Sequence, residues 1–226
     1  YRDDGLNAWP HREGLNVATI RRHAPDLIGL QEAQGPNLAA YHRALPEYHY
    51  SAWPYHFNHP PPEWPAILWR PDVLRPIDSG GFWISETPEE FSGSWGTDCI
   101  RSAGWIRFRG VERGAEFVHL NTHLDHRSEW ARVEGAKLII ARLDALQAGG
   151  AAAIVTADFN CVPASAAYKL FVSAGFVDAH VACGNSADPR ESYTNHGWRG
   201  YPWGRDDDVP QRIDWILTRG LETLDA

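Results

Sequence analysis

Methionine is absent from this 226-residue sequence, and lysine occurs only at Lys137 and Lys169. Without an initiator methionine, the sequence is expected to be a processed chain or a fragment. Arginine therefore supplies nearly all of the basic charge, which suits planar contacts with phosphate oxygens but is equally typical of codon bias. The formal net charge of −8 excludes the global basic surface of a protein that binds nucleic acids nonspecifically.

Cysteine is also scarce, with Cys99, Cys161 and Cys183 as the full set. An odd number excludes a fully bridged disulfide framework within the chain, and no two of them have the short paired spacing of a metal site. No apolar run approaches the roughly 18 residues of a membrane span, and no signal leader opens the sequence. We expect a soluble protein, and the cytoplasm and secretion both stay open.

Hydrophobic residues make up 43% of the sequence and charged residues 22%, as in ordinary globular proteins. No segment has the composition of a linker, so we expect one domain over residues 1–226 with a sizeable core. We also expect a monomer.

The periodicity of apolar residues predicts both helices and strands. The clearest helix covers 128–147, where Ser128 is a suitable N-cap and Gly149 a stop. Neighbouring strands without intervening helices indicate antiparallel pairing, and strand–helix units elsewhere indicate an α/β sandwich. Further helices are expected at 10–24, 37–45 and 165–174, strands at 27–30, 66–69, 82–85, 105–109, 116–124, 152–157 and 212–218, and a loop at 51–65.

Three of the predicted strands end abruptly in polar residues. These ends supply Glu32 in IGLQE, His123 in FVHLNTHLDH, and Asp158 with Asn160 in AIVTADFN. Ligands collect at strand ends in layered α/β folds, because the framework there is rigid and the loops are free to shape a site. A single Asp after a strand is usually a helix cap or a turn residue. The repetition of the pattern favours a shared site of two carboxylates, an imidazole and a carboxamide.

Five segments occur in the order of a known superfamily. They are DGLNAW followed by HR at 4–12, PDLIGLQEA at 25–33, NTHLDH at 121–126, TADFN at 156–160 and RIDWIL at 212–217. The set resembles the endonuclease/exonuclease/phosphatase superfamily of DNase I-like metal-dependent phosphoesterases, and its opening resembles a bacterial branch of generic hydrolases. The resemblance implies a four-layer αββα sandwich, in which two mixed sheets pack face to face between outer helices.

The resemblance also implies roles for individual residues. Glu32 would bind the catalytic Mg²⁺, with Mn²⁺ as the alternative ion. Asp158 and Asn160 would orient or deprotonate the attacking water and steady the phosphate. His123 would face the phosphate, and Asp214 would pair with a later His. A hard cation such as Mg²⁺ often takes only one or two carboxylates, so Glu32 is a sufficient anchor.

Two elements that the resemblance implies are not in the sequence. An Asn-bearing first strand belongs before Tyr1, and a Ser-Asp-His element belongs after Ala226. We expect the native protein to have both.

Other polar residues are weaker candidates for the site. Arg101, Glu63 and His196 are expected to bind substrate, although each is also typical of an ordinary loop or strand end. Asp125 and His126 either line the pocket or are structural. The run 206–208 is expected to be a solvated loop, and the aromatic and His-rich stretch 56–64 is either a substrate-facing loop or loop packing.

The sequence supports two classes of function. The first is a divalent-metal-dependent hydrolase of phosphate esters, either a phosphodiesterase or a phosphatase, which uses in-line attack by an activated water. The alternative is a catalytically silent binding domain with the same fold. The substrate stays open among nucleic acids, phospholipid headgroups and sugar phosphates, with the acidic charge leaning against long nucleic acids.

Overall fold

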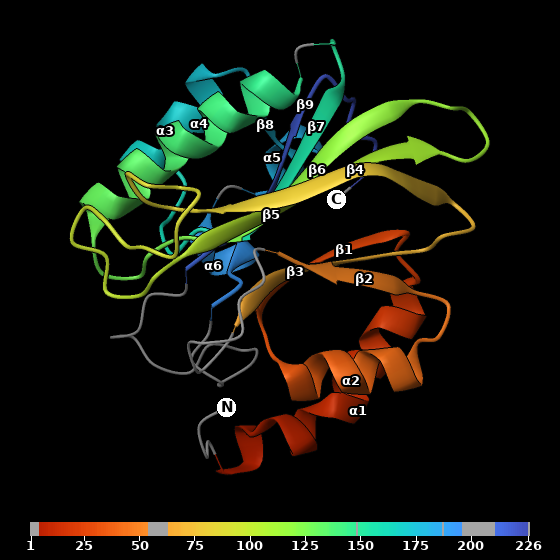
Figure 1. Cartoon of the computed structure of the whole chain (residues 1–226). Coiled ribbons are helices and arrows are strands. Elements are labelled where there is room, and N and C mark those ends of the chain that lie inside the picture. Colours follow the sequence, from red (N-terminus) through yellow and green to blue (C-terminus); the bar gives the residue numbers. More distant parts are fainter. Residues whose placement is uncertain (1–4, 54–62, 148, 187, 196–210, 226) are drawn as a thin grey trace.

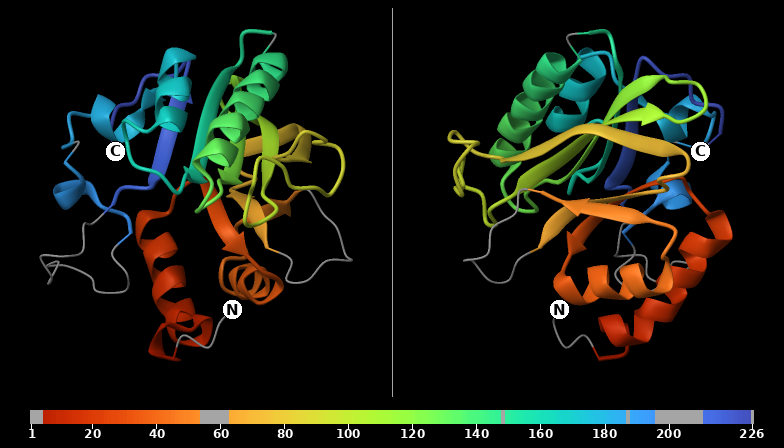
Figure 2. Two further views of the ribbon diagram at one scale, coloured as in Figure 1. Left: turned by 90° about the vertical axis from the view of Figure 1, so that its left-hand side faces the viewer. Right: turned by 45° about the vertical axis from the view of Figure 1, so that its right-hand side comes forward.

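The computed structural model describes residues 5–53, 63–147, 149–186, 188–195 and 211–225. Two β-sheets pack face to face, and helices cover the outer face of each, as Figure 1 shows. This arrangement confirms the predicted four-layer αββα sandwich. The two views in Figure 2 show the same succession of layers from other sides. In the described part of the chain, no helix is long and apolar enough to cross a membrane.

The smaller sheet has three antiparallel strands in the order β1-β3-β2. They are β1 (Leu27–Ala33), β3 (Trp64–Trp69) and β2 (His49–Ala52). The outer face of this sheet is covered by α1 (Trp9–His23) and α2 (Gly35–Ala44). The side chains between them form a continuous apolar cluster, which includes Val17, Leu38, Tyr41, Leu45, Trp64, Ala66 and Leu68.

The larger sheet has six strands in the order β4-β5-β6-β7-β9-β8. Only β6 and β7 pair in parallel among these strands, and α3 crosses over between them. The other neighbouring strands in the sheet are antiparallel. The strands are β4 (Leu74–Trp83), β5 (Ser102–Gly110), β6 (Glu116–His123), β7 (Ala152–Asp158), β8 (Val177–Asp178) and β9 (Asp214–Arg219).

Two helices, α3 (Glu129–Leu146) and α4 (Ala166–Ser173), cover the outer face of the larger sheet. The Ser128 side chain caps α3 by accepting a hydrogen bond from the Ala131 N–H, as the sequence predicts. Gly135 lets α3 approach the sheet closely, because a Cβ there would lie 2.8 Å from Ile84 Cγ2. The remaining short helices are η1 (Gly5–Asn7), α5 (Ala179–Ala182) and α6 (Pro189–Ser192).

The interface between the two sheets is apolar at one end and polar at the other. At the apolar end the rings of Trp69 and Phe108 pack with their centroids 5.6 Å apart. At the polar end β1 comes so close to β7 that a Cβ on Gly29 would lie 2.0 Å from Thr156 Oγ1. Only a residue without a side chain fits there, and this close approach brings the end of β1 against the larger sheet.

The structure also contains strands that periodicity did not predict. The predicted loop 51–65 begins inside β2 and ends inside β3. The expected strand 82–85 is the last part of β4, which begins at Leu74 and passes through Pro76 and the glycines at 80 and 81. Glycine at position 80 leaves room for the Trp105 ring, because a Cβ there would lie only 3.0 Å from the ring. Pro76 is tolerated beside a register shift between Pro76 and Asp78.

Candidate active site

The register of the larger sheet places three polar residues in one row. His123 on β6 is the Cα partner of Asp158 on β7, and Asp158 is the Cα partner of Asp214 on β9. These residues are at the end of β6, the end of β7 and the start of β9, so all three lie at the same edge of the sheet. Hydrogen bonding between the strands therefore holds the row in place.

Glu32 reaches this edge from the other sheet. The pairing of β1 with β3 shifts register between Leu30 and Ala33, and Glu32 has a left-handed backbone with φ of 52°. Such a backbone is uncommon for a residue with a Cβ and indicates a locally imposed conformation. The irregularity turns the Glu32 side chain out of the regular alternation of β1, and the residue is exposed.

A buried asparagine between the sheets holds the end of β1. Asn121 Nδ2 donates to Leu30 O at 2.8 Å and to Ala66 O at 2.9 Å. Its Oδ1 accepts from Gln31 Nε2 at 2.7 Å and from Thr156 Oγ1 at 2.9 Å. Because these contacts fix the residues on the N-terminal side of Glu32, Asn121 is a positioning residue for the glutamate.

The carboxylates in the row repel one another. Burial and the nearby charges of Asp214 and Glu32 together raise the pKa of Asp158 to about 7, and the Asn160 N–H and Arg101 partly offset this rise. Burial also raises the pKa of Asp214, partly offset by Thr194. A carboxyl group in such surroundings is half protonated near neutral pH and favours any cation that replaces the proton.

His123 is held as a neutral imidazole. Burial, with a smaller contribution from the charge of Arg101, lowers its pKa to about 3. Arg101 Nη1 lies 2.9 Å from His123 Nδ1. The ring nitrogen on the other side, Nε2, lies 3.5 Å from Asp158 Oδ2, beside the row of carboxylates.

Asn160 closes the turn after β7 on the same side. Its left-handed backbone, with φ of 49°, is one that asparagine tolerates well. Its N–H donates to Asp158 Oδ1 at 2.8 Å, and its Nδ2 donates to Leu124 O at 2.9 Å. The same Nδ2 lies 2.9 Å from His123 Nε2. The side chains of Asn160 and His123 therefore form one contiguous polar surface beside Asp158.

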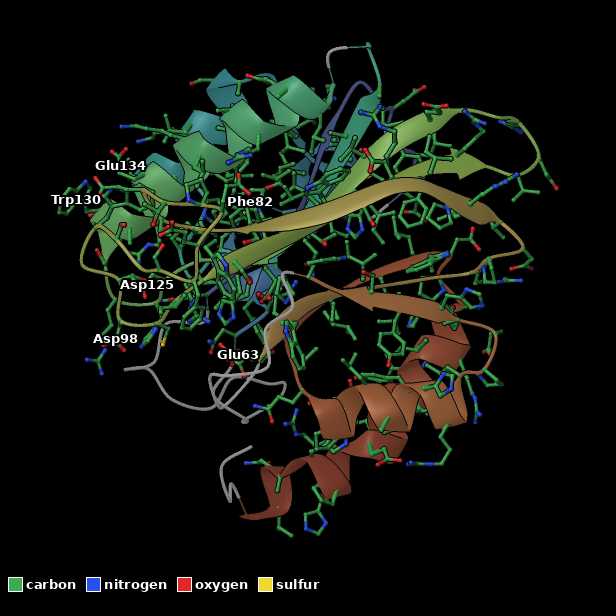
Figure 3. All side chains as sticks on the ribbon, viewed as in Figure 1. Glu63, Phe82, Asp98, Asp125, Trp130 and Glu134 are labelled. Carbon is green, nitrogen blue, oxygen red and sulfur yellow. The ribbon has the colours of Figure 1, made fainter. Side chains whose placement is uncertain are left out.

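Arg101 and Glu63 form the opposite wall. Arg101 Nη1 and Glu63 Oε1 are 3.1 Å apart, and the Arg101 side chain is only 8% exposed. Arg101 Nε is buried without a hydrogen-bond partner in the described part of the chain. Figure 3 labels Glu63 near the open edge of the sheets. A small cavity here is lined by Glu32, Glu63, Trp64, Pro65, Ile100, Arg101, Ser102 and His123.

The structure thus brings together most of the residues singled out in the sequence. His196, the run 206–208 and residues 56–62 lie outside the described residues. Trp64 belongs to the buried core behind β3. Asp125 is 2% exposed and accepts hydrogen bonds from loop backbone, which makes it structural. The residues that form the site are Glu32, Glu63, Arg101, His123, Asp158, Asn160 and Asp214.

Sequence reasoning missed the polar contacts between the sheets. His119, Asn121 and His123 alternate along β6 and therefore point to one face, toward the smaller sheet. His119 and Asn121 are fully buried, and His119 Nε2 lies 2.8 Å from Thr156 Oγ1. Three polar residues with period two in an otherwise apolar strand were the available signal that this face meets a polar interface.

The donor set fits a hard divalent cation. Glu32, Asp158 and Asp214 supply carboxylate oxygens from both sheets, and the raised pKa of Asp158 shows that their charges act on one another. Mg²⁺ and similar ions prefer such oxygens, and they need only one or two carboxylates when water and substrate complete the shell. A bound cation would relieve the repulsion that the carboxylates impose on each other.

Comparison with known proteins places this fold and site in a family. The sequence profile described as the Endonuclease/Exonuclease/phosphatase family matches residues 4–225. The chain belongs to that family. The match confirms the resemblance seen in the sequence motifs. Members of the endonuclease/exonuclease/phosphatase family are phosphoesterases that generally use divalent metal ions. No match was found among curated proteins.

Solved structures of other proteins superpose on this chain. An endonuclease/exonuclease/phosphatase from Bacteroides vulgatus is 29% identical, with a TM-score of 0.86, covering 97% of this chain and 83% of its own. A mannosyl-6-phosphatase from Bacteroides thetaiotaomicron VPI-5482 is also 29% identical, with a TM-score of 0.84 and coverage of 94% and 78%. TDP2 from D. rerio, complexed with a single-strand DNA product, is 15% identical, with a TM-score of 0.69 and coverage of 99% and 81%. The last similarity shows the shared fold alone.

Proposed function

We propose that this protein is a divalent-metal-dependent hydrolase of phosphate esters that uses Mg²⁺, with Mn²⁺ as the alternative. The observation that carries the proposal is the row of His123, Asp158 and Asp214 across three paired strands, with Glu32 facing it from the other sheet. Four ionisable side chains at one edge, three of them acidic, suit a charged ligand bound through a cation.

Glu32 is the proposed principal ligand of the ion, and the neighbouring carboxylates complete its acidic surroundings. Glu32 is exposed at the end of its strand, so it can reach an ion that also contacts water and substrate. When bound, the ion supplies positive charge that neutralises the phosphate oxygens. Asp214 is the Cα partner of Asp158. Its proposed role is to orient the later histidine that the family resemblance implies.

Asp158 is the proposed general base. A base works best when its pKa lies near the working pH, and burial raises the pKa of Asp158 to about 7. Its Oδ1 is occupied by the Asn160 N–H, which leaves Oδ2 as the oxygen that faces the site. We propose that Oδ2 takes a proton from the attacking water as the water oxygen bonds to phosphorus. The bond from phosphorus to the leaving-group oxygen breaks on the opposite side, and that oxygen takes a proton from solvent.

Donors for the phosphate oxygens lie around Asp158. Asn160 Nδ2 and the His123 ring lie beside Asp158, with Asn160 Nδ2 2.9 Å from His123 Nε2. Arg101 adds the charge of a buried guanidinium with an Nε–H unpaired among the described residues. Removing one such donor from a developing oxyanion costs roughly 3 kcal/mol in enzymes that depend on it. Burial lowers the pKa of His123, so the ring would face the phosphate as a neutral imidazole.

Among substrates we place sugar phosphates first. The mannosyl-6-phosphatase with 29% identity supports this choice over most of the chain length. The net charge of −8 disfavours long nucleic acids, which repel an acidic surface. Short nucleic acids and phospholipid headgroups also contain phosphate esters, so they are included as substrates in the experiment below.

The experiment is a hydrolysis screen of the full chain. Sugar phosphates, short DNA and phospholipid headgroup esters are each assayed with Mg²⁺, with Mn²⁺ and with chelator. We expect metal-dependent turnover, and in Asp158→Asn a kcat reduced by at least about a hundredfold with little change in KM. Asp144→Asn, which alters an exposed aspartate paired with Arg219, is the matched control and should keep full activity.

Two results would overturn the proposal. Asp158→Asn with unchanged kcat would remove the base from the mechanism. Tight binding of a phosphate ester without turnover in either metal would favour a catalytically silent binding domain.

A further inference from the structure

A second group of metal-binding side chains lies in two loops next to the site. Asp98 and Cys99 are in the loop before β5, and His126 is in the loop after β6. A carboxylate oxygen, the thiol sulfur and an imidazole nitrogen from these residues all lie within 4.8 Å of one another. Within the described ranges, this is the one set of three such ligand atoms that lie so close together.

The two loops are joined by the buried carboxylate of Asp125. Its Oδ2 accepts from the N–H of Asp98 at 2.9 Å and of Cys99 at 3.2 Å. Its Oδ1 accepts from the N–H of Arg127 at 2.9 Å and of Ser128 at 2.6 Å. Figure 3 shows Asp98 and Asp125 next to each other at the same end of the molecule. The backbone that carries all three ligands is therefore tied to one rigid group.

The ligand types point to a particular ion. Mg²⁺ prefers oxygen ligands, whereas Zn²⁺ binds thiolate, imidazole and carboxylate together and is commonly four-coordinate. Three protein ligands leave the fourth position to water. We propose that Asp98, Cys99 and His126 form a Zn²⁺ site that is separate from the acidic centre at Glu32. This inference does not depend on the proposed function.

A zinc ion could replace the present contacts of Asp98 with His126 and Arg127 at little cost in free energy. His126 Nε2 lies 3.4 Å from Asp98 Oδ2, and Arg127 Nη1 lies 3.4 Å from Asp98 Oδ1. The side chains of Asp98 and His126 are each 40% exposed, so these are weak surface ion pairs that zinc can replace. Burial raises the pKa of the Cys99 thiol. Zinc binding therefore forms a sulfur–zinc bond and releases the thiol proton to solvent.

The position of the site links it to the phosphate-facing residues. Cys99 precedes Arg101 by two residues, and His126 follows His123 by three. Zinc would join the loop that leads into Arg101 to the loop that leaves His123. Occupancy of the site would then restrict the motion of both loops.

The test uses the full chain with excess Mg²⁺, so that the acidic centre is occupied. Co²⁺ reports directly on sulfur, because a cobalt–thiolate bond gives a charge-transfer absorption in the near ultraviolet. Zn²⁺ affinity is measured separately by competition with a chromophoric chelator. We expect one equivalent of each ion, with the cobalt–thiolate band present and suppressed by zinc.

Two ligand variants and one matched control make the test specific. Cys99→Ser should abolish the cobalt–thiolate band. Both Cys99→Ser and His126→Ala should weaken zinc binding. Loss of a residue that only hydrogen-bonds a ligand weakens metal binding by roughly 10- to 100-fold, so loss of a ligand itself should weaken it at least as much. Cys161→Ser, which alters another half-buried thiol, should change neither readout. Circular dichroism checks that each variant is folded.

Several outcomes would overturn the zinc site. These are no cobalt–thiolate band in the unaltered protein, a band that persists in Cys99→Ser, or zinc affinity that is unchanged in both ligand variants. Zinc binding that is lost only in Glu32→Gln would place the ion in the acidic centre instead.

Discussion

The larger sheet holds a buried aspartate, Asp178, and two half-buried ones, Asp158 and Asp214, in opposite surroundings. Asp178, on β8, is paired through both oxygens with Arg212, at 2.6 and 3.3 Å, and each side chain is only 3% exposed. Asp214, on the neighbouring strand β9, and Asp158, on the next strand β7, lie side by side as Cα partners. Within the described residues, neither forms an ion pair with lysine or arginine.

The difference separates a structural carboxylate from a functional one. A buried charge is costly unless it is paired, and Arg212 compensates Asp178 within the chain. For Asp158 and Asp214, burial and mutual repulsion instead raise the pKa of Asp158 to about 7. The uncompensated charges of Asp158 and Asp214 support the proposal that this edge of the sheet binds an external cation.

The largest expected effect on stability comes from removing the arginine of the compensated pair. Arg212→Met leaves Asp178 buried without its partner and should lower the free energy of unfolding by about 3–5 kcal/mol. Asp214→Asn should cause no comparable loss in the presence of chelator, because it removes a repelling charge. Urea unfolding of both variants measures the contrast.

The double variant Asp178→Asn with Arg212→Met serves as the control. It should recover part of the stability lost in Arg212→Met, since no uncompensated charge remains. Equal losses in Arg212→Met and Asp214→Asn would break the distinction between the two positions.

A smaller effect is expected in the pH dependence of stability without metal. The folded pKa of Asp158, about 7, lies above the value of about 3.9 in unfolded chains, so the folded protein binds more protons between these values. The contribution of Asp158 to the free energy of unfolding is fully present below about pH 4 and is lost as the pH rises through about 7. At about 1.4 kcal/mol per pKa unit the loss is at most about 4 kcal/mol.

Asp158→Asn isolates this contribution. Its free energy of unfolding should change less between acidic and neutral pH than that of the unaltered protein, and the variant should be the more stable one at pH 8, approximately, in chelator. Saturating Mg²⁺ should reverse that order by stabilising the unaltered protein. Parallel pH curves for the two proteins would contradict the raised pKa.

Much of the fold follows from sequence, because long helices and buried strands have clear periods. The strands that the sequence did not predict contain residues typical of loops, or are too short to show a period. Glycines and Pro76 in β4 read as a loop, and Gly80 is explained only by the Trp105 ring across the strand pair. The two-residue β8 is too short for any period to register.

The site was predictable where a strand end meets a polar residue, as at Glu32, His123 and Asp158. Its supporting contacts were not, since the hydrogen bonds of Asn121 to β1 join residues about 90 positions apart in sequence. The proposed zinc ligands were also not predicted, because they too come together only in the folded chain. Cys99 has no paired cysteine nearby, and His126 becomes its neighbour only through the hydrogen bonds of Asp125.

The most direct test of the central claim is the pKa of the Asp158 carboxyl group, measured by carbon NMR with and without Mg²⁺. Without metal, we predict a midpoint near the value of about 7 that burial, Asp214 and Glu32 together produce. Saturating Mg²⁺ should lower that midpoint by at least about one unit, because an adjacent cation favours the charged carboxylate. An ordinary midpoint near 4, roughly, or one that Mg²⁺ does not move, would contradict a cation site built from these carboxylates.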